Sequence, residues 1–339
     1  MNNIFRIIIV LAIVCTQIQG QKTKEFKTNE VFDRYFEKDK DIAFSDNILI
    51  GAINAIASFG DNILVVDPIS KKAFVMTHSG KIIKTLNPEE CNPGVQWKPY
   101  EGYVNKNGKI YIMNPPGGFM FGKNGECIKP MNASFFSTQS LCFLSNGNIV
   151  GYYLMGKNRN YLKLMNEQGK EIKKFVDFPK EFQYLENIWR EGGVVSDKYD
   201  NIYLARPSTP EIIKYNKNGS VIGKFRYASP DFRRVTEDLR PNEDRGKGFE
   251  RVIEGKSHIT QIFLLDDNKL LIVAYYKYTK IGMQIYDLEG NKLTSEELIA
   301  NIKPMYASNG RLYFVFQPPI TKNNDIPNPI IKVFKLKAR

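Results

Sequence analysis

Histidine is scarce in this chain: only His78 and His258 occur among its 339 residues. A metal centre with three histidine ligands therefore cannot form. The sequence also lacks a G-x-S-x-G nucleophile elbow and a glycine-rich phosphate loop between a strand and a helix. These absences give no support to the common serine hydrolase and nucleotide-binding sites.

Cysteine is also sparse. Cys15 lies in the N-terminal segment, which leaves Cys91, Cys127 and Cys142. Three cysteines cannot all pair within one chain, and their spacing contains no C-x-x-C motif, so a dense disulfide framework and a zinc or redox motif are excluded. One disulfide and none are equally open alternatives, and buried apolar thiols are favoured over a metal or redox role.

Long apolar runs are missing except near the N-terminus. Arg6 precedes an apolar run that ends at Cys15, and small or polar residues follow to Gly20. The run is too short to span a bilayer, so no transmembrane segment is expected. The pattern predicts a cleaved signal peptide over residues 1–20 and a secreted or periplasmic protein. Cys15 makes a lipoprotein the alternative, although the bulky Val14 before it argues against lipidation.

Runs of charge are absent as well. The formal net charge is +12 and the sequence pI is about 9.3, but lysine and arginine are spread along the whole chain. Without a basic run or an RNA-binding motif, we expect a solvated basic surface and no specific nucleic-acid partner.

Short β-type segments recur along the chain. Five tight turns contain Gly80, Gly125, Gly169, Gly219 and Gly290, at intervals of 45, 44, 50 and 71 residues. Each turn is followed by polar residues and then a short apolar stretch, such as the pairs Ile82–Ile83 and Val221–Ile222, and turns of this kind join the strands of hairpins. A second hairpin precedes each of the five, as in "YVNKNGKIYIMN", and a sixth copy, "MYASNGRLYFVF", lies near the C-terminus.

Six units of two hairpins, with a period near 45 residues, predict an all-β, six-bladed β-propeller with four-stranded antiparallel blades. We expect a single domain over residues 21–339, a monomer, with a charged insertion at about 226–257. The sixth unit supplies only three strands. Because an incomplete sheet would expose its edge, we expect the segment from Glu25 to Phe44 to add the missing strand and close the ring.

The repeat pattern, "[GN]-x-[IL]-[YLV]-[VIL]" followed by "[IL]-x-x-[YFM]-x-x-x-G-x-x-[IV]-x-x-F", resembles that of six-bladed propellers of the NHL-repeat-like class, and in particular exported bacterial families. The resemblance extends from about Asn47 to Leu336. It implies the fold but not the activity, because such propellers include binding proteins, lactonases and lyases.

Strand alternation places the longer loops of all blades on one rim, where we expect function. Both tryptophans, Trp97 and Trp189, lie in connections between blades, where they either contact a ligand or pack between blades. The starts of the innermost strands add polar side chains near the axis, which bind a ligand or are simply hydrated. The candidate ligand-binding residues are Asn54, Trp97, Glu101, Gln139, Trp189, Arg190, Glu191, His258, Gln261 and Lys303.

The favoured function is a binding module for a peptide, a glycan or a partner protein, with no cofactor. The alternative is a metal-dependent enzyme of lactonase or hydrolase type, with calcium held by oxygen atoms of Asn54, Glu101 and Glu191. A scaffold without a small ligand is a third interpretation. No catalytic residue can be named from the sequence, so whether the protein is an enzyme stays open.

Overall fold

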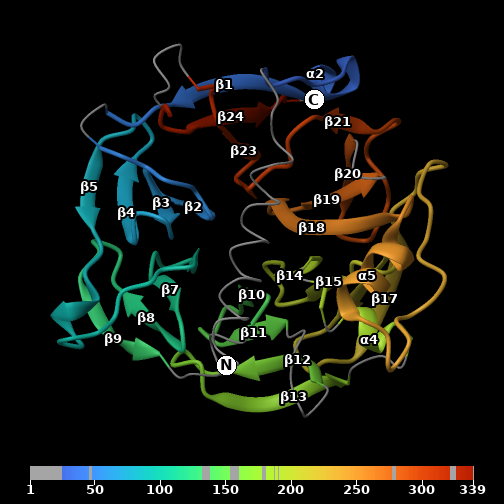
Figure 1. Cartoon of the computed structure of the whole chain (residues 1–339), viewed down its shortest axis with the longest axis horizontal. Coiled ribbons are helices and arrows are strands. Elements are labelled where there is room, and N and C mark those ends of the chain that lie inside the picture. Colours follow the sequence, from blue (N-terminus) through green and yellow to red (C-terminus); the bar gives the residue numbers. More distant parts are fainter. Residues whose placement is uncertain are drawn as a thin grey trace.

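The structure, a computed structural model, describes residues 25–45, 48–131, 138–152, 160–177, 181–186, 188–189, 191–276, 280–320 and 326–338. Six antiparallel sheets of four strands stand in a ring around a central axis (Figure 1). The prediction of a six-bladed propeller is therefore confirmed.

The six blades follow one another along the chain. Blade 1 contains β2 (Ala55–Phe59), β3 (Asn62–Asp67), β4 (Lys72–Thr77) and β5 (Ile82–Thr85). Blade 2 contains β6 (Glu101–Val104), β7 (Ile110–Asn114), β8 (Gly117–Phe121) and β9 (Cys127–Met131). Blade 3 contains β10 (Ser140–Phe143), β11 (Ile149–Tyr152), β12 (Asn160–Met165) and β13 (Glu171–Asp177). Blade 4 contains β14 (Gly193–Ser196), β15 (Ile202–Ala205), β16 (Glu211–Tyr215) and β17 (Val221–Arg226). Blade 5 contains β18 (Ser257–Asp266), β19 (Lys269–Tyr276), β20 (Lys280–Asp287) and β21 (Leu298–Ala300). Blade 6 contains β22 (Tyr306–Ser308), β23 (Arg311–Phe316), β24 (Ile330–Leu336) and β1 (Phe36–Ile42).

The two ends of the propeller differ in the connections between their strands. The first strand of every blade starts at one end, here called the loop rim, and the short hairpin turns lie at the other, the turn rim. Turn-rim glycines such as Gly219 and Gly290 have φ values of 86° and 90°, in the left-handed region that favours glycine. Three residues before Gly219, the Asn216 side chain accepts hydrogen bonds from two backbone N–H groups of its own turn, which fixes the hairpin.

The ring closes by joining distant parts of the chain. Strand β1 pairs antiparallel with β24, from Phe36 opposite Leu336 to Ile42 opposite Ile331. The helix α2 (Glu30–Tyr35), capped by Asn29, leads into β1. The predicted closing strand from the N-terminal segment is therefore confirmed.

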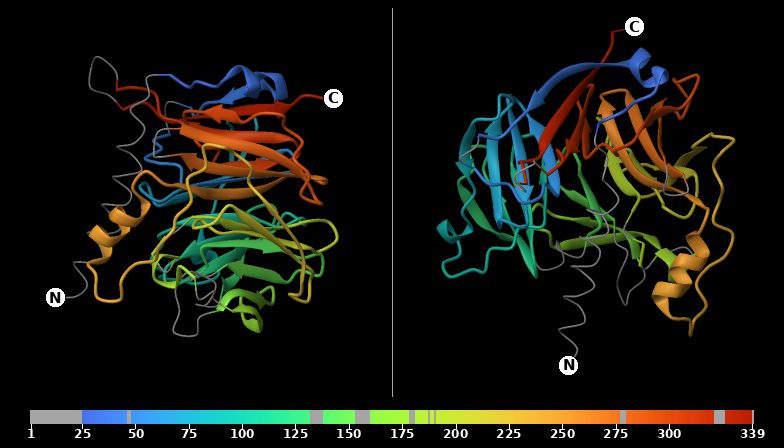
Figure 2. Two further views of the ribbon diagram at one scale, coloured as in Figure 1. Left: turned by 90° about the vertical axis from the view of Figure 1, so that its right-hand side faces the viewer. Right: turned by 45° about the horizontal axis from the view of Figure 1, so that its top comes forward.

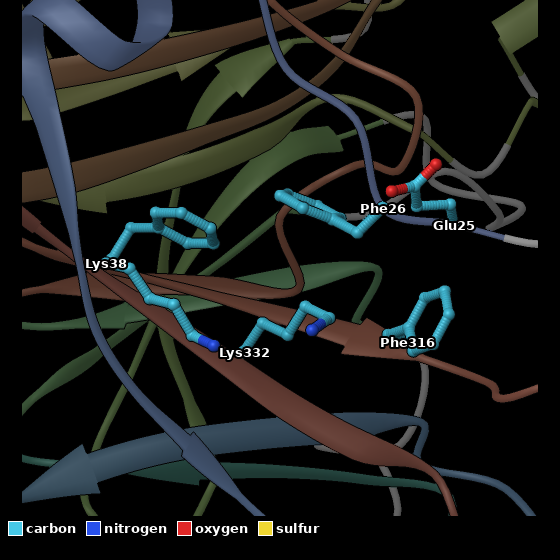
Figure 3. A pocket seen from close by; sticks show the side chains of 6 residues that line it. Glu25, Phe26, Lys38, Phe316 and Lys332 are labelled. Atoms are coloured by element: carbon cyan, nitrogen blue, oxygen red, sulfur yellow. The ribbon is translucent and has the colours of Figure 1, made fainter.

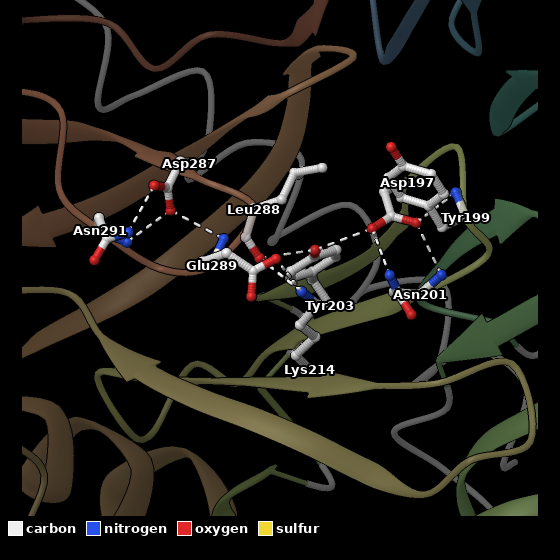
Figure 4. A network of polar contacts seen from close by, with 9 residues as sticks. All are labelled: Asp197, Tyr199, Asn201, Tyr203, Lys214, Asp287, Leu288, Glu289 and Asn291. Atoms are coloured by element: carbon white, nitrogen blue, oxygen red, sulfur yellow. Dashed lines mark hydrogen bonds and ion pairs between the residues drawn. The ribbon is translucent and has the colours of Figure 1, made fainter.

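Neighbouring blades are also tied by polar contacts at the turn rim (Figure 4). The Tyr203 hydroxyl of blade 4 lies 3.1 Å from Asp197 Oδ2 and 3.0 Å from the carbonyl oxygen of Leu288 in blade 5. Lys214 Nζ donates to that same carbonyl at 3.0 Å and to Glu289 at 2.9 Å. Because the Lys214 side chain is only 10% exposed, these bonds satisfy an ammonium group that is largely removed from water.

The segment between β17 and β18 forms a small structure of its own. Its helix α5 (Arg245–Ile253) starts at Asp244, whose side chain accepts from the Lys247 N–H. This helix lies outside the ring beside α4 (Gln183–Glu186) (Figures 1 and 2). Asp238 accepts hydrogen bonds from the backbone N–H groups at the start of α4, which joins the segment to blade 4. We call residues 227–256 the insertion.

One disulfide joins Cys91 and Cys127, and Cys142 is buried and free. The short 3-10 helix at Pro88–Glu90 brings Cys91 to the outer strand β9, with 5.7 Å between the two Cα atoms. Of the two outcomes that the sequence left open, one disulfide or none, the structure shows one disulfide. Their sequence separation of 36 residues gave no local signal of the pairing.

Candidate ligand-binding site

The candidate polar residues lie where the innermost strands begin at the loop rim. Asn54, Gln139 and Lys303 come shortly before β2, β10 and β22, whereas Glu101 is the first residue of β6. Glu191 precedes β14, and His258 and Gln261 belong to β18. Arg190 lies outside the described residues. The topology therefore places these side chains around one end of the axis, but their contacts divide them into two groups.

The first group, the His258–Glu191 group, joins blades 4 and 5 and also contains Trp189 and Tyr275. His258 Nε2 lies 2.5 Å from Glu191 Oε2, and Trp189 Nε1 donates to the same oxygen at 3.0 Å. The Tyr275 ring, opposite His258 on β19, stacks on the imidazole with a centroid distance of 5.7 Å and an interplanar angle of 5°. Both contacts to the carboxylate use the same oxygen, Oε2.

Exposure distinguishes the members of this group. The His258 side chain is 3% exposed and Trp189 is 4% exposed, whereas the Glu191 side chain is 25% exposed. Burial by itself would raise the pKa of Glu191. The His258 imidazole outweighs that effect, with smaller contributions from Lys303 and the Trp189 N–H, so the pKa of Glu191 is lowered. The carboxylate is thus held ionised at a partly open position.

Trp189 connects the site to the insertion. Its ring lies 4.8 Å from the His258 ring and 5.5 Å, edge to face, from the ring of Phe249 on α5. With Leu185 and Val252 it belongs to a small apolar cluster formed by the α4 region and the insertion. Trp189 therefore holds the Glu191 carboxylate through its N–H group, while its ring is buried against the insertion.

Gln261 and Lys303 are the remaining candidate residues of blades 5 and 6. The half-buried Gln261 belongs to blade 5, and its Oε1 is removed from water without a hydrogen-bond partner among the described residues. Such an atom is costly unless a water molecule or a ligand satisfies it. Lys303 precedes the first strand of blade 6 and acts electrostatically on Glu191. Lys303 is thus a cationic group within electrostatic reach of the carboxylate, whereas Gln261 contributes a buried acceptor on β18, the strand that carries His258.

The second group joins blades 1 and 2. Asn54 Nδ2 donates to the carbonyl oxygen of Tyr100 at 2.6 Å, and Glu101 accepts from the Tyr103 hydroxyl at 2.9 Å. Burial and the Glu101 charge raise the pKa of Tyr103. Trp97 packs edge to face on Phe119 in the apolar cluster between these blades. Asn54 thus bonds to the backbone of the next blade, and Trp97 is half-buried.

The residues proposed as calcium ligands do not form one set. Asn54 and Glu101 belong to blades 1 and 2, whereas Glu191 belongs to blade 4 and is bonded to His258 and Trp189. In the part of the chain that the structure describes, no three side chains of His, Cys, Asp or Glu come close enough together to hold a metal ion. Each of the three residues has a protein partner, and those of Asn54 and Glu101 differ from those of Glu191.

Two features of the site were missed from the sequence. Tyr275 was not recognised because its contact with His258 depends on the register of β18 and β19. The other is a buried ion pair between Glu186 of α4 and Arg206, with Nε 3.0 Å from Oε1, to which Ser208 adds a hydroxyl donor. Arg206 and Ser208 lie in the "ARPSTPE" loop, but nothing in that loop indicated a partner twenty residues earlier.

No family model matches the chain, and no curated protein matches it. Solved structures do resemble it. A member of the duf4221 family from Bacteroides vulgatus is 12% identical, with 94% of this chain and 100% of that chain covered and a TM-score of 0.65. A protein from Bacteroides fragilis that is described as exported is 10% identical, with coverage of 92% and 96% and a TM-score of 0.60. A streptogramin B lyase is 14% identical over 92% and 90%, with a TM-score of 0.49.

Identities this low show a shared propeller fold and nothing of the activity. Within the described residues, no helix has both the length and the apolar character needed to cross a bilayer.

Proposed function

We propose that this protein is an exported propeller, of the NHL-repeat-like class, that binds an extended peptide segment at the loop rim between blades 4 and 5. The observation that carries this proposal is the partly exposed side chain of Glu191, 25% exposed, whose Oε2 is fixed by the buried His258 and Trp189. A fixed carboxylate can accept a ligand N–H without first losing the freedom of a mobile side chain.

The neighbouring groups complement a peptide. Lys303, which acts electrostatically on Glu191, adds a donor for a carbonyl oxygen or a terminal carboxylate. The site is less suited to binding a glycan, because the rings of Trp189 and His258 are buried and cannot stack on a sugar. Export is supported by the N-terminal sequence and by the Cys91–Cys127 disulfide, which is typical of proteins outside the cytosol.

The test uses the chain from Gln21 and a library of short peptides, with the bound peptides identified by mass spectrometry. Each selected peptide is then titrated against the native protein and against Glu191→Gln, Gln261→Ala and Lys303→Met. We expect Glu191→Gln to weaken binding at least tenfold, the loss of one charge-assisted hydrogen bond. Glu101→Gln is the matched control, because Glu101 occupies the equivalent strand start in blade 2.

Equal effects of Glu191→Gln and Glu101→Gln would contradict the site, and selection of oligosaccharides but no peptides from parallel arrays would contradict the ligand class. A metal-dependent enzyme has no support from the described residues. It would gain support if calcium restored a melting temperature that EDTA had lowered.

A further inference from the structure

A second concave site lies on the outer part of blade 6, away from the His258–Glu191 group. It has a volume of about 390 Å³, within the range of pockets that bind small molecules. Strands β1, β23 and β24 and the segment before α2 form its walls. The lining residues are Glu25, Phe26, Lys38, Phe316, Lys332 and Phe334 (Figure 3).

One side of the pocket is aromatic. Phe26 lies at centroid distances of 5.0 Å from Phe314 and 5.3 Å from Phe334, so it is anchored to blade 6 by ring contacts. Phe316 lines the pocket from β23, the strand next to β24. Phe26 and Phe334 remain partly exposed, so their rings can bury the apolar surface of a ligand.

The other side carries an excess of positive charge. Lys38 Nζ lies 2.8 Å and Lys332 Nζ 3.5 Å from the same oxygen of Asp41, so two ammonium groups share one carboxylate. The Lys332 side chain is only 18% exposed, and its Nζ lies 5.2 Å from the centre of the Phe316 ring. An additional anion would therefore be favourable here, in an environment where screening by solvent is reduced.

Glu25 does not cancel this excess. Its carboxylate lies 3.6 Å from Lys27 Nζ. Figure 3 shows the Glu25 carboxylate on the far side of Phe26 from the two ammonium groups. The pocket therefore has an aromatic region and, at one end, a cationic region.

We propose that this pocket binds a small aromatic carboxylate. Its ring packs against Phe26, Phe316 and Phe334, and its carboxylate accepts hydrogen bonds from Lys332 and Lys38. The binding needs no metal, and it is independent of the peptide site proposed at the loop rim.

Isothermal titration calorimetry of the native chain with 2-naphthoate tests this inference. The neutral 2-naphthamide and the non-aromatic decanoate are titrated in parallel. We expect saturable 1:1 binding of 2-naphthoate, at least tenfold weaker binding of each of the other two, and weakening of the naphthoate complex by added salt. No saturable binding, or equally tight binding of the amide or of decanoate, would overturn the proposal.

Variants locate the site. Lys332→Met keeps the apolar stem and removes the charge, so we expect at least a tenfold loss of 2-naphthoate binding. Lys335→Met is the matched control, because Lys335 is an exposed lysine on the same strand but not in the pocket. Unchanged binding by Lys332→Met would overturn the assignment. If Lys332→Met does not fold, Lys38→Met on β1 takes its place, and unchanged binding by that variant counts equally against the proposal.

Discussion

Replacing Trp189 by alanine should open the insertion without unfolding the propeller. Trp189 is 4% exposed and contacts Phe249 of α5 and His258 of β18, so the substitution leaves a large cavity. Truncations of buried tryptophan cost about 3–5 kcal/mol. The cluster that contains Trp189 is built from the α4 region and the insertion, not from the blade sheets. Most of this loss should therefore appear as local opening of the insertion.

The size of the effect follows from the energy. A loss of about 3 kcal/mol raises the open population roughly 100-fold, because each 1.4 kcal/mol is a factor of ten. Where opening and closing are fast, proteolysis follows the population of the open form. We therefore expect tryptic cleavage at Arg245, Lys247 and Arg251 in α5 to accelerate by about two orders of magnitude. Mass spectrometry of timed digests measures this cleavage rate.

Trp97→Ala is the control for this experiment. Trp97 packs in the apolar cluster between blades 1 and 2, so its loss should lower the melting temperature without exposing α5. Trp189→Phe should restore part of the protection. If Trp189→Ala leaves the cleavage rate in α5 unchanged while the melting temperature falls as in Trp97→Ala, then Trp189 does not anchor the insertion and our assignment of the cluster is wrong.

Three further predictions concern the propeller and its site. Reduction of the Cys91–Cys127 disulfide should lower the free energy of unfolding by about 4 kcal/mol for a loop of this length, measured by urea unfolding with and without reductant; an unchanged midpoint would contradict it. Lys214→Ala should cost about 1–3 kcal/mol in the same assay because it removes the hydrogen bonds between blades 4 and 5, whereas Lys217→Ala in an exposed turn should cost little. The pKa of Glu191 is lowered from its ordinary value of 4.5 in the folded protein, so the ionised carboxylate stabilises the fold at pH values above 4.5. This contribution should be lost as the pH falls below 4.5 and the carboxylate becomes protonated. Glu191→Gln should therefore flatten the acid side of a plot of melting temperature against pH, and an unchanged acid side would refute this.

The fold could be predicted because each blade repeats one local rule. Turns with Gly125 or Gly219 need a positive φ, and the apolar pairs after them mark the outer strands, so the hairpins can be counted from sequence. The missing fourth strand of the last blade then predicts closure by an earlier segment, which β1 provides. The hairpin signals are local in the sequence, and the closure of the ring follows from counting the strands that they predict.

The site could be predicted only as a set of positions. Counting strands places Glu191 and His258 at the loop rim, but their 2.5 Å contact depends on how blades 4 and 5 stand beside each other. Whether Trp189 contacts a ligand or packs was equally open, because its neighbour Phe249 lies in an insertion with no repeat to align. The pairing of Cys91 with Cys127 stayed open for the same reason, because a loop and an outer strand meet only in the folded blade.

The pairing of β1 with β24 has a consequence for how the molecule forms. Phe36 pairs with Leu336, at the other end of the propeller sequence, so no partial product of the ribosome can complete the sixth sheet. Until residues 330–336 arrive, β1 has no partner strand and the incomplete blade presents a bare sheet edge. Formation of this blade should therefore be the last step of folding, with a rate that depends on chain closure more than on the order in which the other blades assemble. A chain released before its last strand would be a target for aggregation rather than a shorter propeller.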